Sequence, residues 1–182
     1  ITKEYERLQN TLQLIAAENQ CSRVVLAALG SVIQNKTTEG FPGGRCHGGC
    51  EVVDEVEMLA ITRAKEAFGA KYANVQPHSG VNANMAVYIA APKLGAPVLS
   101  MKLDHGGHIS HGAKASLTGH CYQFTHYGVD KETELIDYDE VLKLARLCGP
   151  KMIVGGASSY PRLIDYKKLR EIADSVGACL LI

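Results

Sequence analysis

The stretch KMIVGGASSYPRLIDYKKLREIADSVGACLLI, residues 151–182, decides the fold class. It opens with a short β-prone run at 151–155 and closes with a second at 178–182, and residues 165–176 between them have the pattern of a helix. A helix that connects two apolar runs is typical of neighbouring parallel strands, because a parallel connection needs a long crossover. The stretch therefore predicts a strand, a helix and a strand of an α/β protein.

The same alternation extends back to residue 72. Further β-prone runs lie at 72–76, 97–103 and 122–127, and helix-like segments lie at 81–91 and 138–148. Strands that alternate with helices predict a mostly parallel sheet covered by helices. The run at 178–182 is apolar throughout, which is typical of a buried strand.

The residues before this sheet are predicted to be mainly helical. Residues 50–68 place apolar side chains at helical spacing and are followed by Gly69, a common helix terminator. Ser22 is suited to cap a second helix that runs to Leu29, and the first fourteen residues look helical as well. These segments predict a helical N-terminal arm, whose first helix would carry an apolar stripe of Tyr5, Leu8, Leu12 and Ile15.

Composition restricts the classes of function. The 182 residues include 19 Lys plus Arg and 19 Asp plus Glu, so no net field would gather nucleic acid or anionic lipid. The most apolar stretch, 85–101, is interrupted by Lys93 and two prolines, which excludes a membrane span. Six cysteines without a C-x-x-C pair favour a reducing compartment, and the charged first residues do not resemble a signal peptide. We expect a cytoplasmic protein.

A first candidate site lies where the run at 72–76 leads through Ser79 and Gly80 into the helix at 81–91. The free N–H groups and the positive dipole end of a helix start attract a phosphate, and a glycine lets the backbone approach it. A serine that only caps the helix would give the same pattern. The segment is therefore consistent with both a phosphate site and a plain helix cap.

A histidine cluster forms a second candidate site. The sequence HGGHISH, residues 105–111, follows the predicted strand at 97–103. Imidazoles at this spacing could bind zinc, could lie flat against an aromatic cofactor, or could belong to an ordinary surface loop. Zinc would gain ligands from Cys46, His47 and Cys50 only if the fold brought them close, and we expect no metal.

A third candidate is the glycine-rich segment at 35–49. It contains five glycines and one proline around Glu39, Arg45 and His47. Glycines allow backbone to wrap closely around a ligand, and Glu39 and His47 are groups that can carry protons. A flexible loop would also be rich in glycine, but Phe41 and Pro42 are unusual in a solvated linker, so we favour the functional interpretation.

Taken together, these segments resemble serine hydroxymethyltransferase, a fold-type-I, aspartate-aminotransferase-like family that depends on pyridoxal 5'-phosphate. The resemblance covers essentially the whole chain, and its motifs together are highly specific. They are LIAAEN at 14–19, EGFPG at 39–43, GGCE at 48–51, NVQPHSG at 74–80, HGGHISHG at 105–112, LIDY at 135–138 and REIAD at 170–174.

The resemblance implies transfer of one carbon between serine and glycine, with tetrahydrofolate as the carrier. It implies catalytic roles for Glu39, His47 and His108, with Glu39 carrying a proton near the substrate and His108 stacked on the coenzyme ring. It also implies a homodimer with shared active sites. The coenzyme contacts would be Ser79, Gly80, Val81, His108, Ser158 and Thr37, and the substrate and folate contacts would be Ala17, Glu39, Leu103, Gly107, His108 and Ile109.

The chain departs from the family pattern near the substrate. Ala17 and Val81 stand where most members carry serine, and Thr37, Cys46 and His47 stand where they carry tyrosine. The lost ring at Thr37 could leave room for a substituent on the substrate's α-carbon. The alternative function is therefore a hydroxymethyltransferase, aldolase or transaldolase of α-methylserine or another substituted β-hydroxy amino acid.

The resemblance also implies a domain division. Residues 1–50 would form the helical arm with the dimer and active-site loop, and residues 51–182 would form the first part of the large coenzyme-binding α/β domain. No lysine in this chain matches the one that family members bond to the coenzyme, so we expect residues 1–182 alone to be inactive. A non-catalytic binding or assembly module and a metal-binding regulator are the remaining alternatives.

Overall fold

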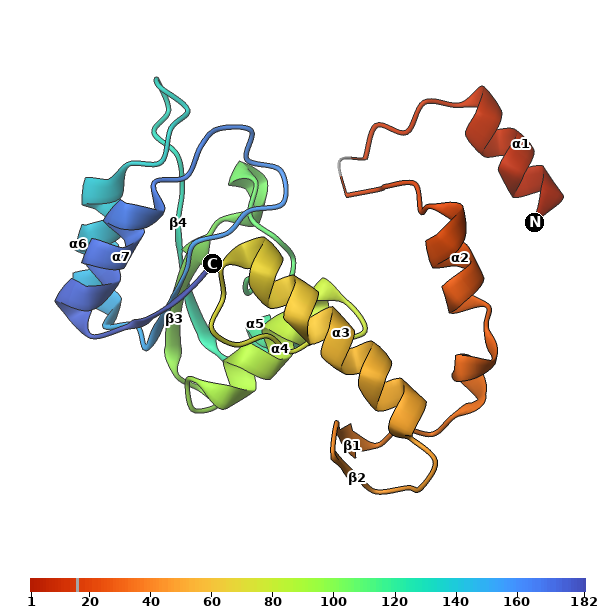
Figure 1. Ribbon diagram of the computed structural model, residues 1–182. Coiled ribbons are helices and arrows are strands. Elements are labelled where there is room, and N and C mark those ends of the chain that lie inside the picture. Colours follow the sequence, from red (N-terminus) through yellow and green to blue (C-terminus); the bar gives the residue numbers. More distant parts are fainter. Residues whose placement is uncertain (16) are drawn as a thin grey trace. The chain divides into compact units, whose positions relative to one another are not determined.

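The computed structural model describes residues 1–15 and 17–182. Ala16, within the LIAAEN motif, lies outside the described residues. The chain packs as two compact units, residues 1–77 and residues 78–182, and each is described by itself (Figure 1). The predicted domain boundary at residue 50 is not tested by this division into compact units and stays a prediction.

The second unit is built on a four-stranded parallel sheet, which confirms the α/β class. The strand order is β4-β3-β5-β6, and every neighbouring pair runs parallel. A parallel sheet needs covering on both faces, and helices supply it here. The strands are β3 (Pro97–Met101), β4 (Gln123–Tyr127), β5 (Met152–Val154) and β6 (Cys179–Leu181), and the helices are α4 (Gly80–Ala90), α5 (Leu117–Cys121), α6 (Tyr138–Cys148) and α7 (Tyr166–Val176), with a 3-10 turn η2 (Leu103–His105) after β3.

Alternation along the strands divides the core into two layers. Leu99 and Ile153 belong to the cluster that packs with α6 and α7, whereas Val98 and Met152 pack with Tyr88 of α4. Successive side chains of a strand point to opposite faces, so both faces of this sheet are apolar. Figure 1 shows α6 and α7 side by side on one face of the sheet.

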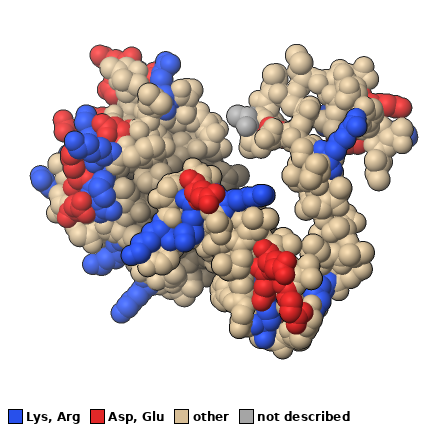
Figure 2. All heavy atoms as spheres, viewed as in Figure 1, with Lys and Arg blue, Asp and Glu red and all other residues tan. Residues whose placement is uncertain are grey.

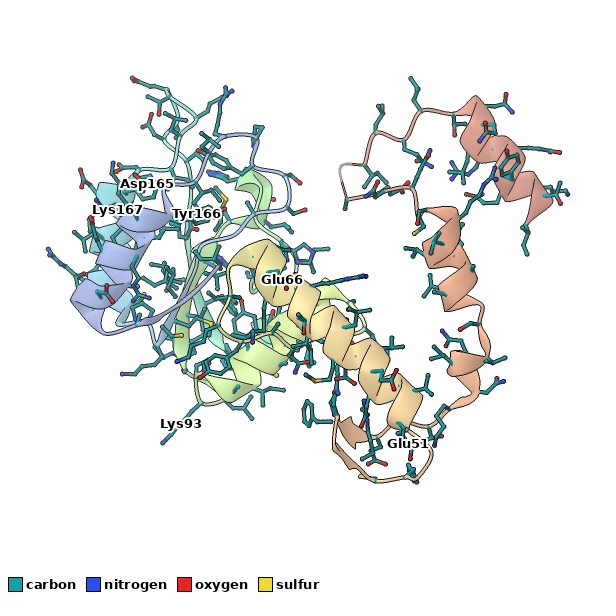
Figure 3. The ribbon with its side chains drawn as sticks, viewed as in Figure 1. Glu51, Glu66, Lys93, Asp165, Tyr166 and Lys167 are labelled. Carbon is teal, nitrogen blue, oxygen red and sulfur yellow. The ribbon has the colours of Figure 1, made fainter. Side chains whose placement is uncertain are left out.

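Helices α6 and α7 begin and end as their sequences predict. The Asp137 carboxylate accepts from the backbone N–H groups of the first turn of α6, and the Asp165 carboxylate accepts from Lys168 N at the start of α7. Gly149 and Gly177 follow the two helices in the left-handed conformation that favours glycine. Asp165 and the first residues of α7 are labelled in Figure 3.

Charges of both signs are mixed over the surface of α6 and α7 in Figure 2. Lys143 pairs with Glu140 on α6, and Arg170 pairs with Asp174 on α7. Mixed signs agree with the zero net charge and give this face no single-signed field. No helix in the described part of the chain is long and apolar enough to cross a membrane.

The first unit consists of helices and one small hairpin. Helices α1, α2 and α3 have no buried residue, and many of their apolar side chains are exposed. Glu51 and Glu66 mark the two ends of α3 in Figure 3. The elements are α1 (Thr2–Asn10), α2 (Arg23–Leu29), a 3-10 turn η1 (Val32–Asn35), β1 (Gly40–Phe41), β2 (Gly44–Arg45) and α3 (Glu51–Phe68).

Two predictions about the first unit were wrong. The first helix ends at Asn10, before Leu12 and Ile15, because the Thr11 hydroxyl donates to Arg7 O at 2.8 Å and the Thr11 backbone is extended. Residues 72–76 form no strand. Instead, the Asn74 side chain accepts from Gln76 N at 2.9 Å, which is a local turn that competes with strand pairing.

Two strand predictions in the second unit also need correction. β3 ends at Met101, and Leu103 already belongs to η2. β6 forms as predicted, but it lies at an edge of the described sheet. Cys179 is exposed and Leu180 is only half-buried, so β6 lacks the full burial that its apolar sequence predicts.

Candidate functional site

A cleft of about 390 Å³ lies in the second unit, where the start of α4 meets the loops that follow β3 and β5. Ligands of open α/β sheets bind beyond the carboxyl ends of the strands, and this cleft has that position. Two of the three candidate segments predicted from the sequence meet here, the Ser79 turn and the histidine cluster. The lining residues are Ser79, Gly80, Val81, Asn84, His108, His111, Gly156 and Ala157.

The start of α4 presents its backbone N–H groups to the cleft. Ser79 is the N-cap in an extended conformation, and its Oγ accepts from Asn82 N at 3.2 Å, so the hydroxyl hydrogen remains free to donate. A Cβ built on Gly80 would meet no atom within 4 Å, and the first turn contains no acidic residue. This helix start therefore fits an anionic group such as a phosphate.

Two glycines shape the loop that carries the histidines. Gly106 has φ of 104°, and an added Cβ would lie 2.8 Å from Tyr160 Cα. A Cβ on Gly107 would collide with the backbone oxygen of Met101 and lie 2.8 Å from that of Lys102. The loop therefore folds tightly over the end of β3 and needs both glycines. It places His108 at the cleft.

His108 and His111 lie against each other at the wall of the cleft. Their ring centroids are 5.5 Å apart at an interplanar angle of 60°, and the backbone N–H of His108 donates to His111 Nδ1 at 3.4 Å. Burial, assisted by the neighbouring His108, lowers the pKa of His111 to about 4. His111 is therefore neutral near pH 7 and lines the cleft as an uncharged ring.

The other predicted contacts of this unit lie around the cleft. Ser158 directly follows the lining residue Ala157, and its N–H donates to Gly106 O at 2.8 Å, but its side chain is exposed and is outside the lining. Leu103 lines a separate hollow of about 350 Å³. Ile109 is exposed. The ring contact of Ser158 and the folate contacts of Leu103, Gly107 and Ile109 stay predictions.

Glu39 and His47 lie near each other in the first unit. Glu39 Oε2 lies 3.7 Å from His47 Nε2, and Cys46 N donates to Glu39 O at 2.9 Å across the β1-β2 hairpin. Both side chains are exposed, with 72% of Glu39 and 49% of His47 accessible. The separation is longer than a hydrogen bond, so the two groups lie near each other as separate proton carriers.

The hairpin that presents Glu39 is anchored by Arg45. Its guanidinium donates to Asp54 Oδ1 at 2.8 Å, to Glu57 Oε2 at 2.5 Å and to the backbone oxygens of Thr38 and Gly40. The Gly43 N–H and the Arg45 guanidinium lower the pKa of the Asp54 carboxyl. The nearly buried Arg45 side chain therefore fixes the conformation of this loop.

Thr37 and Ala17 also belong to the first unit. The Thr37 carbonyl accepts from the buried Cys50 thiol at 3.7 Å, and the Thr37 side chain is exposed. Ala17 is exposed in a turn. The structure therefore presents the predicted site residues as two groups, one in each unit, and their coenzyme and substrate contacts stay predictions.

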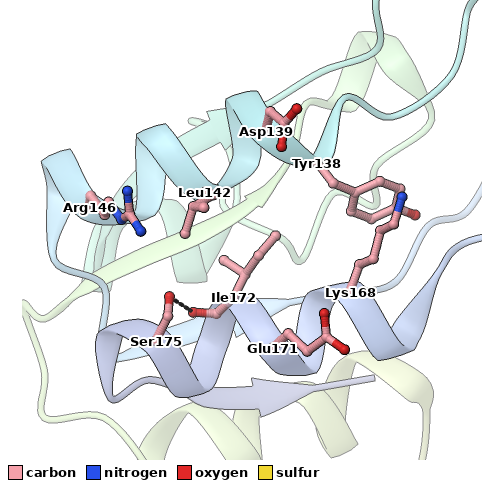
Figure 4. Close-up of a pocket in the computed structure, with 8 residues that line it drawn as sticks. All are labelled: Tyr138, Asp139, Leu142, Arg146, Lys168, Glu171, Ile172 and Ser175. Carbon is pink, nitrogen blue, oxygen red and sulfur yellow. Dashed lines mark hydrogen bonds between the residues drawn. The ribbon is translucent and has the colours of Figure 1, made fainter.

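Another cavity, of about 270 Å³, lies between α6 and α7 (Figure 4). Its walls mix Asp139 and Glu171 with Arg146 and Lys168, and the Lys168 ammonium lies 5.1 Å above the Tyr138 ring. The mixed charges favour no class of ligand. Among the described residues, no group of three or more His, Cys, Asp or Glu side chains is placed to hold a metal ion.

Asn84, His111, Gly156 and Ala157 line the cleft without having been predicted as site residues. Asn84 could have been found, because it lies four residues after Gly80 and so on the same face of the helix. His111 belongs to the histidine cluster, but spacing alone does not say which imidazoles turn inward. Gly156 and Ala157 carry no chemical signal, and only the strand order brings them here.

The chain matches one known protein family along its whole length. The sequence model of the family described as "SHMT: Serine hydroxymethyltransferase" matches residues 1–182, which is the whole chain. Both groups of candidate residues fall inside the match. The chain belongs to the serine hydroxymethyltransferase family.

Proposed function

We propose that the protein interconverts serine and glycine with pyridoxal 5'-phosphate as coenzyme and tetrahydrofolate as one-carbon carrier. The observation that carries the proposal is the cleft, in which a phosphate-suited helix start at Ser79 and an imidazole at His108 line one space. Family membership supports a hydroxymethyltransferase-like activity in general terms. A cytoplasmic enzyme of one-carbon metabolism is part of the same proposal.

Three residues at the start of α4 would hold the coenzyme's phosphate. The N–H groups of Gly80 and Val81 are in the first helical turn, and the Ser79 hydroxyl has a free hydrogen. These donors satisfy phosphate oxygens, and the helix dipole adds to the attraction. The open space beside Gly80 lets the backbone approach without a side chain in the way.

His108 would cover the coenzyme ring. When bound, pyridoxal phosphate supplies an electron sink that weakens a bond at the α-carbon of an amino acid. The task of His108 is to orient that ring and to exclude water from one of its faces. The tight glycines at 106 and 107 support this role, because they fix the backbone that carries the imidazole.

Glu39 and His47 would handle the proton at the substrate's hydroxymethyl group. Each of the two side chains can carry a proton, and both are exposed on the same loop, so either could exchange a proton with a substrate oxygen. Arg45 is nearby, but its guanidinium is already paired with Asp54 and Glu57. It therefore fixes the hairpin, and Glu39 would carry the proton.

Self-association as a homodimer is part of the proposal. Helices α1, α2 and α3 bury no residue within the described chain, although they carry apolar side chains such as Leu26, Val52 and Leu59. Such faces gain free energy when another surface covers them. A second copy of the chain is the partner that the family resemblance implies, and sedimentation of the full-length protein tests it.

Transfer to or from an α-substituted serine is the second candidate. The observation that favours it is Val81, which lines the cleft where most family members carry a serine hydroxyl, together with the smaller Thr37 in place of tyrosine. Val81 removes a hydroxyl group, and Thr37 removes an aromatic ring. The space left by that ring would admit a methyl group on the substrate's α-carbon.

One experiment separates the two candidates. The full-length protein is incubated with pyridoxal 5'-phosphate and either L-serine or α-methylserine, with and without tetrahydrofolate, and the amino-acid products are quantified. Folate-dependent formation of glycine from L-serine supports the first function. Turnover confined to α-methylserine supports the second, and turnover of neither contradicts both.

A further inference from the structure

Asn84, Ser110 and His108 form one continuous hydrogen-bonded chain at the cleft. Asn84 Nδ2 donates to Ser110 Oγ at 2.8 Å, and Ser110 Oγ lies 2.7 Å from His108 Nδ1. The backbone N–H of Ser110 donates to the same Nδ1 at 3.1 Å. Ser110 is 3% exposed, so water competes little for these bonds. The chain connects α4 to the histidine loop.

The direction of this chain follows from its donors. A backbone N–H can only donate, so His108 Nδ1 must offer its lone pair to Ser110 N. The Ser110 hydroxyl then accepts from the Asn84 amide and gives its own hydrogen to Nδ1. In a neutral imidazole with an unprotonated Nδ1, the hydrogen is on Nε2.

We propose that Asn84 and Ser110 are positioning residues that fix His108 as the Nε2–H tautomer, so that Nε2 is the donor left for a ligand in the cleft. The inference rests on the proposed function, because the coenzyme ring is the group that His108 would cover. Two bonds to Nδ1 also restrict rotation of the imidazole. These hydrogen bonds, called here the Asn84–Ser110–His108 relay, thus set both the plane of the His108 imidazole and the nitrogen that donates.

Substitutions of Asn84 and Ser110 test whether the relay, and not general packing around the loop, sets the tautomer of His108. Asn84→Asp replaces the donor with a carboxylate that only accepts, so the Ser110 hydroxyl turns toward it and no longer donates to His108. Ser110→Ala removes the hydroxyl, and Ser110→Thr keeps it. Asn82→Asp is the matched control, because it adds the same charge on the same helix at an exposed side chain.

The readout is the protonation state of each ring nitrogen, measured by two-bond ¹H–¹⁵N spectra of the full-length protein with ¹⁵N-labelled histidine and without coenzyme. His108→Gln assigns the signals. We expect a protonated Nε2 and an unprotonated Nδ1 in the wild type, Ser110→Thr and Asn82→Asp. We expect a mixture of tautomers in Asn84→Asp and Ser110→Ala. Unchanged His111 signals would show that the loop is still folded.

A His108 with its hydrogen on Nδ1 in the wild type would overturn the inference. A His108 tautomer that is unchanged in both Asn84→Asp and Ser110→Ala would overturn it as well. Titration with pyridoxal 5'-phosphate keeps this failure distinct from failure of the proposed function. If the wild type binds no coenzyme, the proposed function fails, and the spectra still decide the relay. If it binds, Ser110→Ala should weaken coenzyme affinity roughly tenfold relative to Ser110→Thr, the effect of one lost hydrogen bond.

Discussion

Arg45 Nε donates to Asp54 Oδ1 over 2.8 Å and so ties the hairpin that presents Glu39 to the first turn of α3. The same guanidinium reaches Glu57, and the Arg45 side chain is only 5% exposed. A planar fork that satisfies two carboxylates and two carbonyls cannot be copied by an ammonium group. The position of Glu39 therefore depends on an arginine that needs no contact with substrate.

Arg45→Lys should loosen this hairpin. We expect faster amide hydrogen exchange at Gly43, whose N–H donates to Asp54 Oδ2, and at Cys46, whose N–H donates to Glu39 O across the hairpin. We also expect a lower turnover rate with unchanged coenzyme affinity. Arg7→Lys in the exposed pair with Glu4 is the control and should leave both quantities unchanged. Exchange at Gly43 that is as slow in Arg45→Lys as in the wild type would contradict this role of Arg45.

His111 should make the stability of the protein depend on pH. Its pKa in the fold is about 4, below the ordinary value of 6.5, so the unfolded chain binds the extra proton more readily. The free energy of unfolding should therefore be highest above pH 6.5 and should fall as the pH drops toward 4. The full shift corresponds to at most ~3 kcal/mol.

Denaturant unfolding of the wild type and His111→Gln at several pH values measures this contribution. Burial lowers the pKa of His126 as well, so the test is the difference between the two proteins, in which the His126 contribution cancels. We expect His111→Gln to lose part of the slope between pH 6.5 and 4. The exposed His120→Gln is the control and should keep the wild-type slope. An equal slope in all three proteins would refute the prediction.

Gly107→Ala should disturb the histidine loop. The added methyl group would meet the backbone oxygens of Met101 and Lys102, which cannot move without breaking the end of β3. We expect a loss of ~1–3 kcal/mol in the free energy of unfolding, together with weaker coenzyme binding. Gly30→Ala, where the nearest neighbour of the new methyl group would be 3.7 Å away, is the control. Equal stabilities of the two variants would argue against a tight loop.

Local sequence signals account for the parts of the fold that were predicted well. Helix α6 and the start of α7 follow from an aspartate cap, an apolar stripe and a closing glycine. Prediction failed where a side chain bonds its own neighbourhood, as at Thr11 and Asn74. The sequence predicts only a glycine-rich loop where the β1-β2 hairpin forms, because Arg45 holds the hairpin through carboxylates that lie nine and twelve residues further along the chain.

The candidate site shows the same division. The pattern of a helix start is enough to name Ser79, whereas the cluster at 105–111 predicts only a group of imidazoles, from which the family resemblance selects His108. Ser110 is an ordinary serine in sequence, and its bond to Asn84 joins residues that are 26 positions apart. Such contacts depend on the packing of α4 against the loop after β3, which no local pattern encodes.

The most direct measurement of the central claim is a paired binding titration of the full-length protein with pyridoxal 5'-phosphate and with unphosphorylated pyridoxal, followed by absorbance. If the Ser79 turn binds the phosphate, pyridoxal 5'-phosphate should bind at least roughly a hundredfold more tightly than pyridoxal, since charge-assisted hydrogen bonds to the phosphate contribute ~1.5–3 kcal/mol each. Equal affinities for the two compounds would mean that the start of α4 is only a capped helix, and the proposed coenzyme site would be wrong.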